Sequence, residues 1–327
     1  MDTQAHSIQS ISSFYGISPS KLRRYYRNQL SGYQDWAHRD NASQGLIFPE
    51  NISTQLSIDE TSFSQGELYT VVSSKHAKGK KGTIVAIMKG TKAENIISIL
   101  EKIPLRLRNK VEEITLDLAG NMGLIAKKCF PNAVQVIDRF HVQQLVTEAL
   151  QEIRIKYRWD AIDEENELIE KAKHSKKKYD PEILPNGDTV KQLLARSRYL
   201  LYKSEGKWSE DQQQRGGILF ERYPEIENAY RISQELSWIF NNTGDKLYGF
   251  ARLAKWNEKV EQSGFKSFNT VSRTIILHHK RILNYFDNKS TNASAESFNA
   301  KIKAFRSQFR GVGDINFFLF RLTRLFA

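Results

Sequence analysis

Three acidic residues stand in stretches of sequence where an acid is unexpected. Asp59 in LSIDETS and Asp117 in ITLDLAG interrupt segments that otherwise have the apolar and hydroxyl-bearing residues of a buried strand. Glu296 lies in TNASAESFNAKIKAFRSQFRG (291–311), among lysines, arginines and asparagines. Carboxylates in buried strands are costly unless they are paired or bound to a metal ion. Oxygen ligands favour Mg²⁺ or Mn²⁺, and two such ions can catalyse phosphoryl chemistry by activating the attacking oxygen and stabilising the leaving one.

Glu296 is expected on the polar face of a helix. The spacing i, i+4, i+7, i+11 predicts an apolar face made of Phe298, Ile302, Phe305 and Phe309. At about 100° per residue, Glu296 points about 200° away from Phe298. It shares the polar face with Asn299, Lys303 and Arg310. We expect these three residues to line the path of a nucleic-acid strand beside the acid.

Each acid, taken alone, also has a purely structural explanation. A glutamate in the first turn of a helix can complement the helix dipole or complete a capping box, although Ala293, three residues before Glu296, is a poor partner for such a box. Asp59 could be a strand-edge acid paired with a lysine. Asp117 could cap the helix that begins near Asn121. The order strand, strand, helix favours a joint function for the three acids.

Length and charge limit the classes of protein to which the chain can belong. With 327 residues it is long enough for two domains, or for one domain that carries a large insertion. Its 49 basic residues outnumber 37 acidic ones, which gives a net charge of +12 and a pI near 9.5. Such an excess favours polyanions and makes nucleic acid the leading partner. A basic surface that serves solubility is the alternative.

Cysteine content and hydropathy point to a cytoplasmic protein. The single cysteine, Cys129, excludes an internal disulfide and a cysteine-based zinc cluster within this chain, and it fits a reducing compartment. No stretch approaches the roughly 18 uncharged apolar residues of a membrane span. The start, MDTQAHSIQS, has neither the basic residues nor the apolar run of a signal peptide. We therefore expect a cytoplasmic, nucleoid-associated protein with no membrane partner.

Residues 7–38 are expected to form two short helices separated by a turn. The first ends at Gly16, and Ser18 can cap a second helix, KLRRYYRNQLSGYQDW, that begins after Pro19. The basic residues of the second helix are Lys21, Arg23, Arg24 and Arg27. This arrangement resembles a helix-turn-helix, with the basic residues where a DNA-reading helix would carry them. A helical hairpin with a solvated basic face fits the same pattern.

The period of the sequence changes from helical to extended at residue 54. Segments 54–63 and 67–75 predict a β-hairpin and 83–90 a third strand. Helices are expected at 91–103 and 121–130, with strands at 111–120 and 132–140 and a long helix from His141. Together these elements predict a mixed sheet with helices on its faces, in which the later strands are parallel and buried. Residues 142–288 show helical patterns only, so a helical block interrupts the α/β unit.

Four segments carry a resemblance to a known family. They are IDET (58–61), ITLDLAGN (114–121), FPNAVQVIDRFHV (130–142) and TNASAESFNAKIKAF (291–305), the last followed by RGVGDINFF. The sequence resembles bacterial insertion-sequence transposases of the DDE type, most closely the ISL3 family. The combination of DRFHV after PNA with the distant N-x-x-x-E-x-x-N-x-x-I-K carries the resemblance, which spans most of residues 52–320.

The resemblance implies a ribonuclease H-like core in which Asp59, Asp117 and Glu296 bind two Mg²⁺ or Mn²⁺ ions. Strand alternation places Asp59 and Glu60 on opposite faces, so one of them can serve the site, and the resemblance points to Asp59. The implied reaction is cleavage at transposon ends by metal-activated water, followed by attack of the liberated 3′ hydroxyl on target DNA. The expected divisions are 1–48, the helix-turn-helix-like segment; 49–158, the first part of the core; 159–288, the helical insertion; and 289–327, the closing helices.

The tetrapeptide formed by Asp138, Arg139, Phe140 and His141 matches a signature of the family. Its role is open. His141, at the start of a helix, could contact a DNA phosphate, or it could hold the strand-to-helix turn as a buried histidine.

The sequence departs from the family at its beginning. Relatives usually carry an N-terminal zinc-binding segment with helix-turn-helix regions, whereas this chain has no cysteine pair. Recognition of transposon ends is therefore expected to depend on a separately encoded DNA-binding protein or on the basic helices here. The resemblance also implies a homo-oligomer that joins transposon ends and target DNA. A DNA-binding protein that has lost catalysis and a metal-dependent nuclease without strand transfer are the alternatives.

Overall fold

The structure, a computed structural model, describes residues 7–64, 66–309 and 312–327. The chain forms two compact units. The first contains the residues up to Asp138 together with those from Lys289 onwards, and the second contains Arg139–Asn288. Residues 139–158, which are expected in the first part of the core, form the beginning of a long helix that belongs to the second unit.

A six-stranded mixed sheet forms the centre of the first unit. Its order is β1-β4-β3-β2-β5-β6. The strands are β1 (Gly45–Ile47), β2 (Gln55–Ser64), β3 (Glu67–Ser74), β4 (Ile84–Lys89), β5 (Glu113–Leu116) and β6 (Val134–Ile137). Antiparallel pairing joins β1 to β4, β4 to β3 and β3 to β2, whereas β2, β5 and β6 are parallel to one another. The predicted mixed sheet and its parallel later strands are confirmed, and β1 is an additional edge strand.

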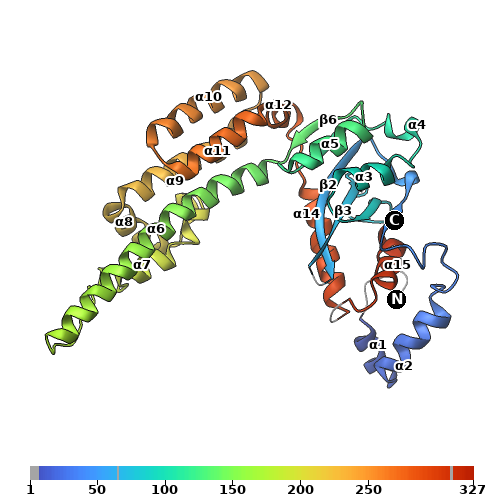
Figure 1. Ribbon diagram of the computed structural model, residues 1–327, viewed down its shortest axis with the longest axis horizontal. Helices are drawn as coiled ribbons and strands as arrows, with labels where there is room; N and C mark the ends of the chain where they lie inside the picture. The colour runs from blue at the N-terminus through green and yellow to red at the C-terminus, as the bar shows by residue number, and fades with distance from the viewer. Residues whose placement is uncertain (1–6, 65, 310–311) are drawn as a thin grey trace. The chain divides into compact units, whose positions relative to one another are not determined.

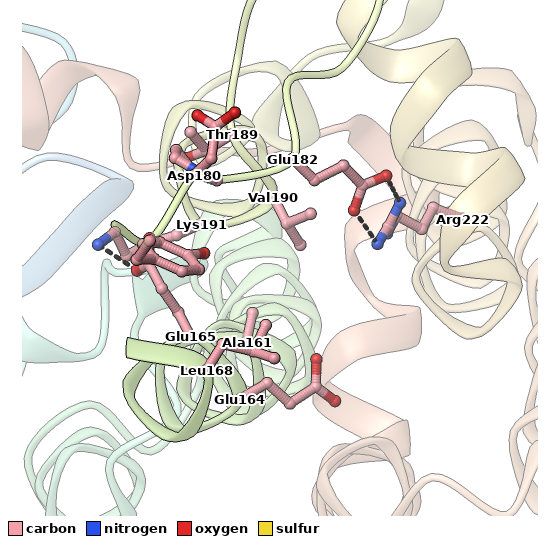
Figure 2. A pocket seen from close by; sticks show the side chains of 12 residues that line it. Ala161, Glu164, Glu165, Leu168, Asp180, Glu182, Thr189, Val190, Lys191 and Arg222 are labelled. Atoms are coloured by element: carbon pink, nitrogen blue, oxygen red, sulfur yellow. Dashed lines mark hydrogen bonds and ion pairs between the residues drawn. The ribbon is translucent and has the colours of Figure 1, made fainter. Parts of the chain in front are cut away.

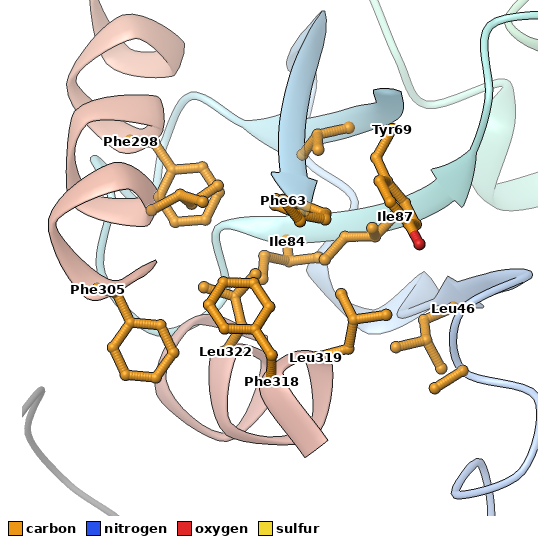
Figure 3. Close-up of a cluster of buried hydrophobic side chains, with 13 residues drawn as sticks. Leu46, Phe63, Tyr69, Ile84, Ile87, Phe298, Phe305, Phe318, Leu319 and Leu322 are labelled. Carbon is orange, nitrogen blue, oxygen red and sulfur yellow. The ribbon is translucent and has the colours of Figure 1, made fainter. Parts of the chain in front are cut away.

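The core of the first unit lies between this sheet and two helices, α14 (Ala293–Ser307) and α15 (Ile315–Phe326). Figure 3 shows Phe298 and Phe305 of α14 in this core, where Phe305 packs on Phe318 of α15 with ring centroids 5.4 Å apart. The predicted apolar face of α14 is thus buried at Phe298, Ile302 and Phe305. Phe309 lies beyond the end of the helix and packs half-buried on Phe318. Each buried side chain of this size contributes about 1.5–3 kcal/mol through removal of apolar surface from water.

Three further helices belong to the sheet region of the first unit: α3 (Ala93–Leu100), α4 (Leu105–Arg108) and α5 (Gly120–Cys129). α3 contacts β1, β4 and α5, and α5 contacts β5 and β6. In α3 and α5 the apolar residues repeat at helical spacing, so one stripe of each of these two helices is buried. Ile96 and Leu100 of α3 and Met122 and Ile125 of α5 are fully buried.

The N-terminal segment contains α1 (Ile8–Tyr15), α2 (Pro19–Tyr25) and a π-helical turn, η1 (Tyr26–Leu30). Gly16 ends α1 in the left-handed conformation (φ 62°), as the sequence predicts. The second helical segment ends at Leu30 and not near Trp36, because the chain turns at Gly32, which has φ 75°. Rings from this segment and from α15 then pack together: Tyr26, Tyr33, Phe317 and Phe320.

The second unit is helical, in agreement with the sequence pattern. Its helices are α6 (Arg139–His174), α7 (Val190–Arg196), α8 (Glu210–Arg222), α9 (Pro224–Asn242), α10 (Lys246–Ser263), α11 (Lys266–Leu277), α12 (His279–Leu283) and α13 (Tyr285–Asn288). Helix α6 contacts α7, α9 and α11, and α9 contacts α10 (Figure 1). The fully buried Trp256 donates a hydrogen bond from its indole N–H to the Ile232 carbonyl at 2.9 Å, which joins α10 to α9.

Within the described residues, each helix is too short or too polar to cross a membrane.

Candidate active site

Asp59 and Asp117 lie level with each other on neighbouring parallel strands. The register of β2 and β5 pairs Ser57 with Thr115. Two residues further along lie the two aspartates, both half-buried: Asp59 within β2, and Asp117 directly after the last residue of β5. Because side chains alternate between the faces of a sheet, residues at equivalent positions of paired strands point to the same face. The two carboxylates therefore belong to one face of the sheet, at the end of the paired segment.

That face is the one covered by α14. The Asn299 amide of α14 donates a hydrogen bond to Asp59 Oδ2 at 2.6 Å. Further along β2, Phe63 has the same orientation as Asp59 and packs against α15 at Phe318, with ring centroids 5.6 Å apart. The N–H of Glu60 donates to Asp59 Oδ1 at 2.8 Å, so the carboxylate is held by its own strand and by the helix.

Glu296 lies in the first turn of α14 with an exposed side chain. Residues three apart share one side of a helix, so Glu296 lies on the same side of α14 as Asn299 and one turn before it. Since Asn299 contacts Asp59, this side of the helix is turned toward the strand that carries the first aspartate. Across residues 7–64, 66–309 and 312–327, no three His, Cys, Asp or Glu side chains converge closely enough to hold a metal ion. The metal-binding role of Asp59, Asp117 and Glu296 stays a prediction.

Glu60 points to the opposite face of the sheet, as strand alternation predicts. It receives a side-chain hydrogen bond from Asn121 of α5. Burial raises the pKa of the Glu60 carboxyl, the charges of Asp117 and Asp59 raise it further, and only the Asn121 bond opposes them. Negative charge is thus concentrated where the pairing of β2 with β5 ends, at Asp59 and Glu60 of β2 and at Asp117 directly after β5. An oxygen-rich, negatively charged donor set of this kind fits Mg²⁺ or Mn²⁺.

Asp117 also shapes the path of the chain out of β5. Its Oδ1 accepts a hydrogen bond from the N–H of Ala119 at 2.8 Å. Helix α5 begins at Gly120, with Ala119 in the capping position. The carboxylate therefore closes a turn before the helix. Asp117 is thus not the cap of the helix near Asn121, which was the alternative explanation for this acid.

Comparison with known proteins gives the family. A sequence model of the family described as transposase, the ISL3 group of the DDE type, matches residues 56–322. The chain belongs to this family. It is 21% identical over 249 residues to the transposase for insertion sequence element IS1557 of Mycobacterium tuberculosis, a match that covers 76% of this chain and 54% of that protein. It is 21% identical over 277 residues to the transposase for insertion sequence element IS1001 of Bordetella parapertussis, covering 83% of this chain and 60% of that protein. The chain thus spans little more than half the length of these relatives.

The predicted DNA-binding residues at the N-terminus of this ISL3-family member differ in exposure and in contacts. Lys21, Arg23 and Arg24 are exposed on α2. Arg27 forms an ion pair with Asp314 at 2.5 Å and lies over aromatic rings, so it ties the N-terminal segment to the start of α15.

The remaining predicted DNA contacts are divided between the two units. Lys303 is exposed on α14, and Arg310 falls outside the described residues. Asn299, predicted to contact DNA, has its amide N–H on Asp59. His141 lies in the first turn of α6, in the second unit, half-buried, with its ring at an edge-on angle to Phe140. DNA binding by these residues stays a prediction.

Periodicity did not reveal a buried polar cluster next to the aspartates. Lys75, which follows β3, pairs with Glu113 of β5, and both side chains are at least nine-tenths buried. Asp138, 1% exposed, follows β6 at the position level with Asp117, because Leu116 pairs with Ile137. The available sequence signal was an acid inside the strand pattern EEITLD, a placement that burial makes costly.

A well-formed cavity of about 250 Å³ lies in the second unit, between α6 and residues 179–191. Figure 2 shows the Arg222 guanidinium facing the Glu182 carboxylate, with two hydrogen bonds of 2.8 Å. Lys191 pairs with Glu165 on the opposite wall. The basic groups of this cavity are therefore matched by acids of the cavity itself, and we assign it no catalytic role.

Proposed function

We propose that this chain carries the catalytic core of a DNA transposase, which cleaves DNA at transposon ends and transfers the 3′ hydroxyl into target DNA. Asp59, Asp117 and Glu296 are the proposed metal ligands. The observation that supports the proposal is the level position of Asp59 on β2 and Asp117 at the end of β5, together with the contact of Asp59 with Asn299 of α14, the helix that bears Glu296. We also propose that the first unit is ribonuclease H-like. Its antiparallel β2–β3–β4 meander, continued by parallel β5 and β6, supports this reading.

The residues of the site have distinct tasks in this proposal. A pair of divalent ions, when bound, activates an attacking oxygen and stabilises the leaving oxygen. The carboxylates of Asp59, Asp117 and Glu296 supply the negative charge and the oxygen atoms that such ions require. Asn299 fixes the orientation of Asp59 through its 2.6 Å hydrogen bond, and so prevents that carboxylate from rotating away from Asp117.

The first test is a metal-dependent nicking assay on supercoiled plasmid DNA. We expect Asp59→Asn, Asp117→Asn and Glu296→Gln each to reduce nicking to background while DNA binding in a gel-shift assay persists. Glu94→Gln is the matched control, because Glu94 is also an exposed glutamate in the first turn of a helix, α3. If Glu296 served the helix dipole alone, both glutamine variants would nick DNA normally.

The same assay separates the alternatives. Joined target products identify strand transfer, whereas nicking without them indicates a metal-dependent nuclease. A wild-type chain that binds DNA but never nicks it would be a DNA-binding protein of the same fold. Normal nicking by any one of the three carboxylate variants would remove that residue from the site.

A further inference from the structure

A buried lysine joins the sheet to the chain that returns from the second unit. The Lys75 side chain is 10% exposed. Its Nζ donates to Glu113 Oε1 at 3.1 Å, to Ser290 Oγ at 2.5 Å and to Thr115 Oγ1. An ammonium group has three N–H donors. The three acceptors therefore match the full donor capacity of this lysine.

Ser290 is held from two sides in this cluster. Its hydroxyl accepts from Lys75 and donates to Glu113 Oε1. Glu113 and Thr115 belong to β5, on the face that also carries Asp117. The chain is thus fixed to the strand of the second aspartate just before α14 begins.

Among the described residues, the side chain of Thr291 also supports the start of α14: its hydroxyl accepts from the Ala293 N–H at 3.4 Å. Asn292 occupies the N-cap position and is fully buried, but its side chain makes no capping hydrogen bond. Neither of its amide atoms has a hydrogen-bond partner among the described residues. Glu296 therefore lies between two attachments. Ser290 joins the chain to β5, and Asn299 joins it to β2, and these are the strands of the two aspartates.

The topology gives such an attachment a role at the start of α14, ahead of the buried apolar residues of the helix. The chain leaves the first unit at Asp138 and returns at Lys289, with the whole second unit between them. The covalent chain alone leaves the register of α14 against the sheet poorly determined, because a long intervening segment restricts its ends only slightly. Buried polar groups can fix such a register, because their hydrogen bonds are all made in only one position of the helix. A buried ion pair adds little stability compared with apolar side chains of the same volume. Its charges must meet their partners in one arrangement, so it is suited to fixing a register.

We propose that Lys75 is a positioning residue. Through Ser290 it sets the start of α14, and with it the position of Glu296. The effect on catalysis rests on the proposed function of Glu296, whereas the attachment itself can be measured without any activity.

Ser290→Ala is the least disruptive test, because it removes one hydroxyl and leaves the Lys75–Glu113 pair in place. The reporter is the amide of Glu296, which donates to the Asn292 carbonyl at 2.8 Å. Loss of the two hydroxyl hydrogen bonds is expected to speed hydrogen exchange of this amide about tenfold. The metal concentration for half-maximal nicking is expected to rise about tenfold, with the rate at saturating metal nearly unchanged.

A double variant, Lys75→Met with Glu113→Gln, removes both charges and so avoids an unpaired buried ion. We expect a melting temperature near that of the wild type and the same two changes at Glu296. The matched control is Lys89→Met with Glu67→Gln, which removes an exposed pair of 2.8 Å from the same sheet. Exchange at Glu296 and the metal requirement should not change in this control.

The outcomes separate the two proposals. Wild-type exchange at Glu296 in Ser290→Ala would overturn the positioning role, however the double variant folds. Faster exchange with an unchanged metal requirement would also overturn it. Faster exchange in a chain whose wild type never nicks DNA would leave the attachment standing and refute the proposed catalytic function.

Discussion

Asn299 distinguishes two kinds of residue on the polar face of α14. Its position beside Lys303 and Arg310 predicts a DNA contact, yet its amide donates to Asp59 at 2.6 Å. If the proposed function holds, a group that orients the Asp59 carboxylate would affect metal binding, whereas an exposed lysine such as Lys303 would affect DNA affinity. The same helix face can therefore serve both tasks with different residues.

Asn299→Ala tests this division. We expect the metal concentration for half-maximal nicking to rise about 10- to 100-fold, because the Asp59 carboxylate loses its orienting partner. DNA affinity, measured by fluorescence anisotropy, should stay within about twofold of the wild type. The reason is that we expect the Asn299 side chain to contact Asp59 and not a DNA phosphate. Lys303→Ala is the control from the same helix and should show the reverse pattern. Weaker DNA binding with unchanged metal dependence in Asn299→Ala would assign the residue to DNA instead.

Cys129 gives a prediction that depends on pH. The residue is fully buried at the end of α5, and burial raises the pKa of its thiol to about 11. The neutral thiol therefore dominates below that pH, and at pH 8 about one molecule in a thousand carries the reactive thiolate. We expect a thiol reagent to react at pH 8 only after denaturation. Full labelling of the native protein within minutes would contradict the buried position of this residue.

Helix α8 contains two adjacent glycines whose surroundings differ. A Cβ placed on Gly216 would lie 2.5 Å from the Trp208 ring, whereas one on Gly217 would have no neighbour within 4 Å. The Trp208 ring is held by a hydrogen bond to the Leu200 carbonyl and by packing on Phe220, so it has little freedom to move. The close approach of α8 to this ring therefore requires glycine at position 216 but not at position 217.

Alanine substitutions at these glycines should have opposite effects on stability. Gly216→Ala is expected to lower the free energy of unfolding by about 1–3 kcal/mol through overpacking. Gly217→Ala should raise it by about 0.5–1 kcal/mol, because alanine loses less backbone entropy in a helix. Urea denaturation followed by circular dichroism compares the two. Equal changes in the free energy of unfolding for the two variants would contradict the close packing of Trp208 against Gly216.

Several elements could be predicted from the sequence because local periodicity determines them. The spacing of Phe298, Ile302 and Phe305 predicted the buried face of α14, and alternation along β2 predicted that Asp59 and Glu60 point apart. Periodicity could not predict the three-residue strand β1, which is too short to show a pattern.

Contacts between distant segments carry no periodic signal. The bond from Lys75 to Ser290 joins residues 215 positions apart, and the bond from Asn299 to Asp59 joins residues 240 apart. Tertiary packing creates both, so the sequence predicted the acids of the candidate site but not the groups that position them.

The molecule as a whole combines a discontinuous unit with a contiguous one. The first unit carries the aspartates before the second unit and Glu296 after it, so the candidate site is complete only when both segments of the first unit come together. In the proposed function, the net charge of +12 would supply a general attraction for DNA. Specific placement of the three acids has to come from the sheet, from α14 and from the contacts at Lys75 and Asn299.

Anomalous diffraction from Mn²⁺-soaked crystals would show whether Asp59, Asp117 and Glu296 bind divalent ions together. We expect anomalous peaks among the carboxylates of Asp59, Asp117 and Glu296, and we expect these peaks to be lost from Asp117→Asn crystals soaked in parallel. Crystals of the Glu94→Gln variant should retain the peaks. Wild-type crystals that bind Mn²⁺ on the Glu60 face of the sheet, or that show no peak near Asp59 and Asp117, would contradict the account.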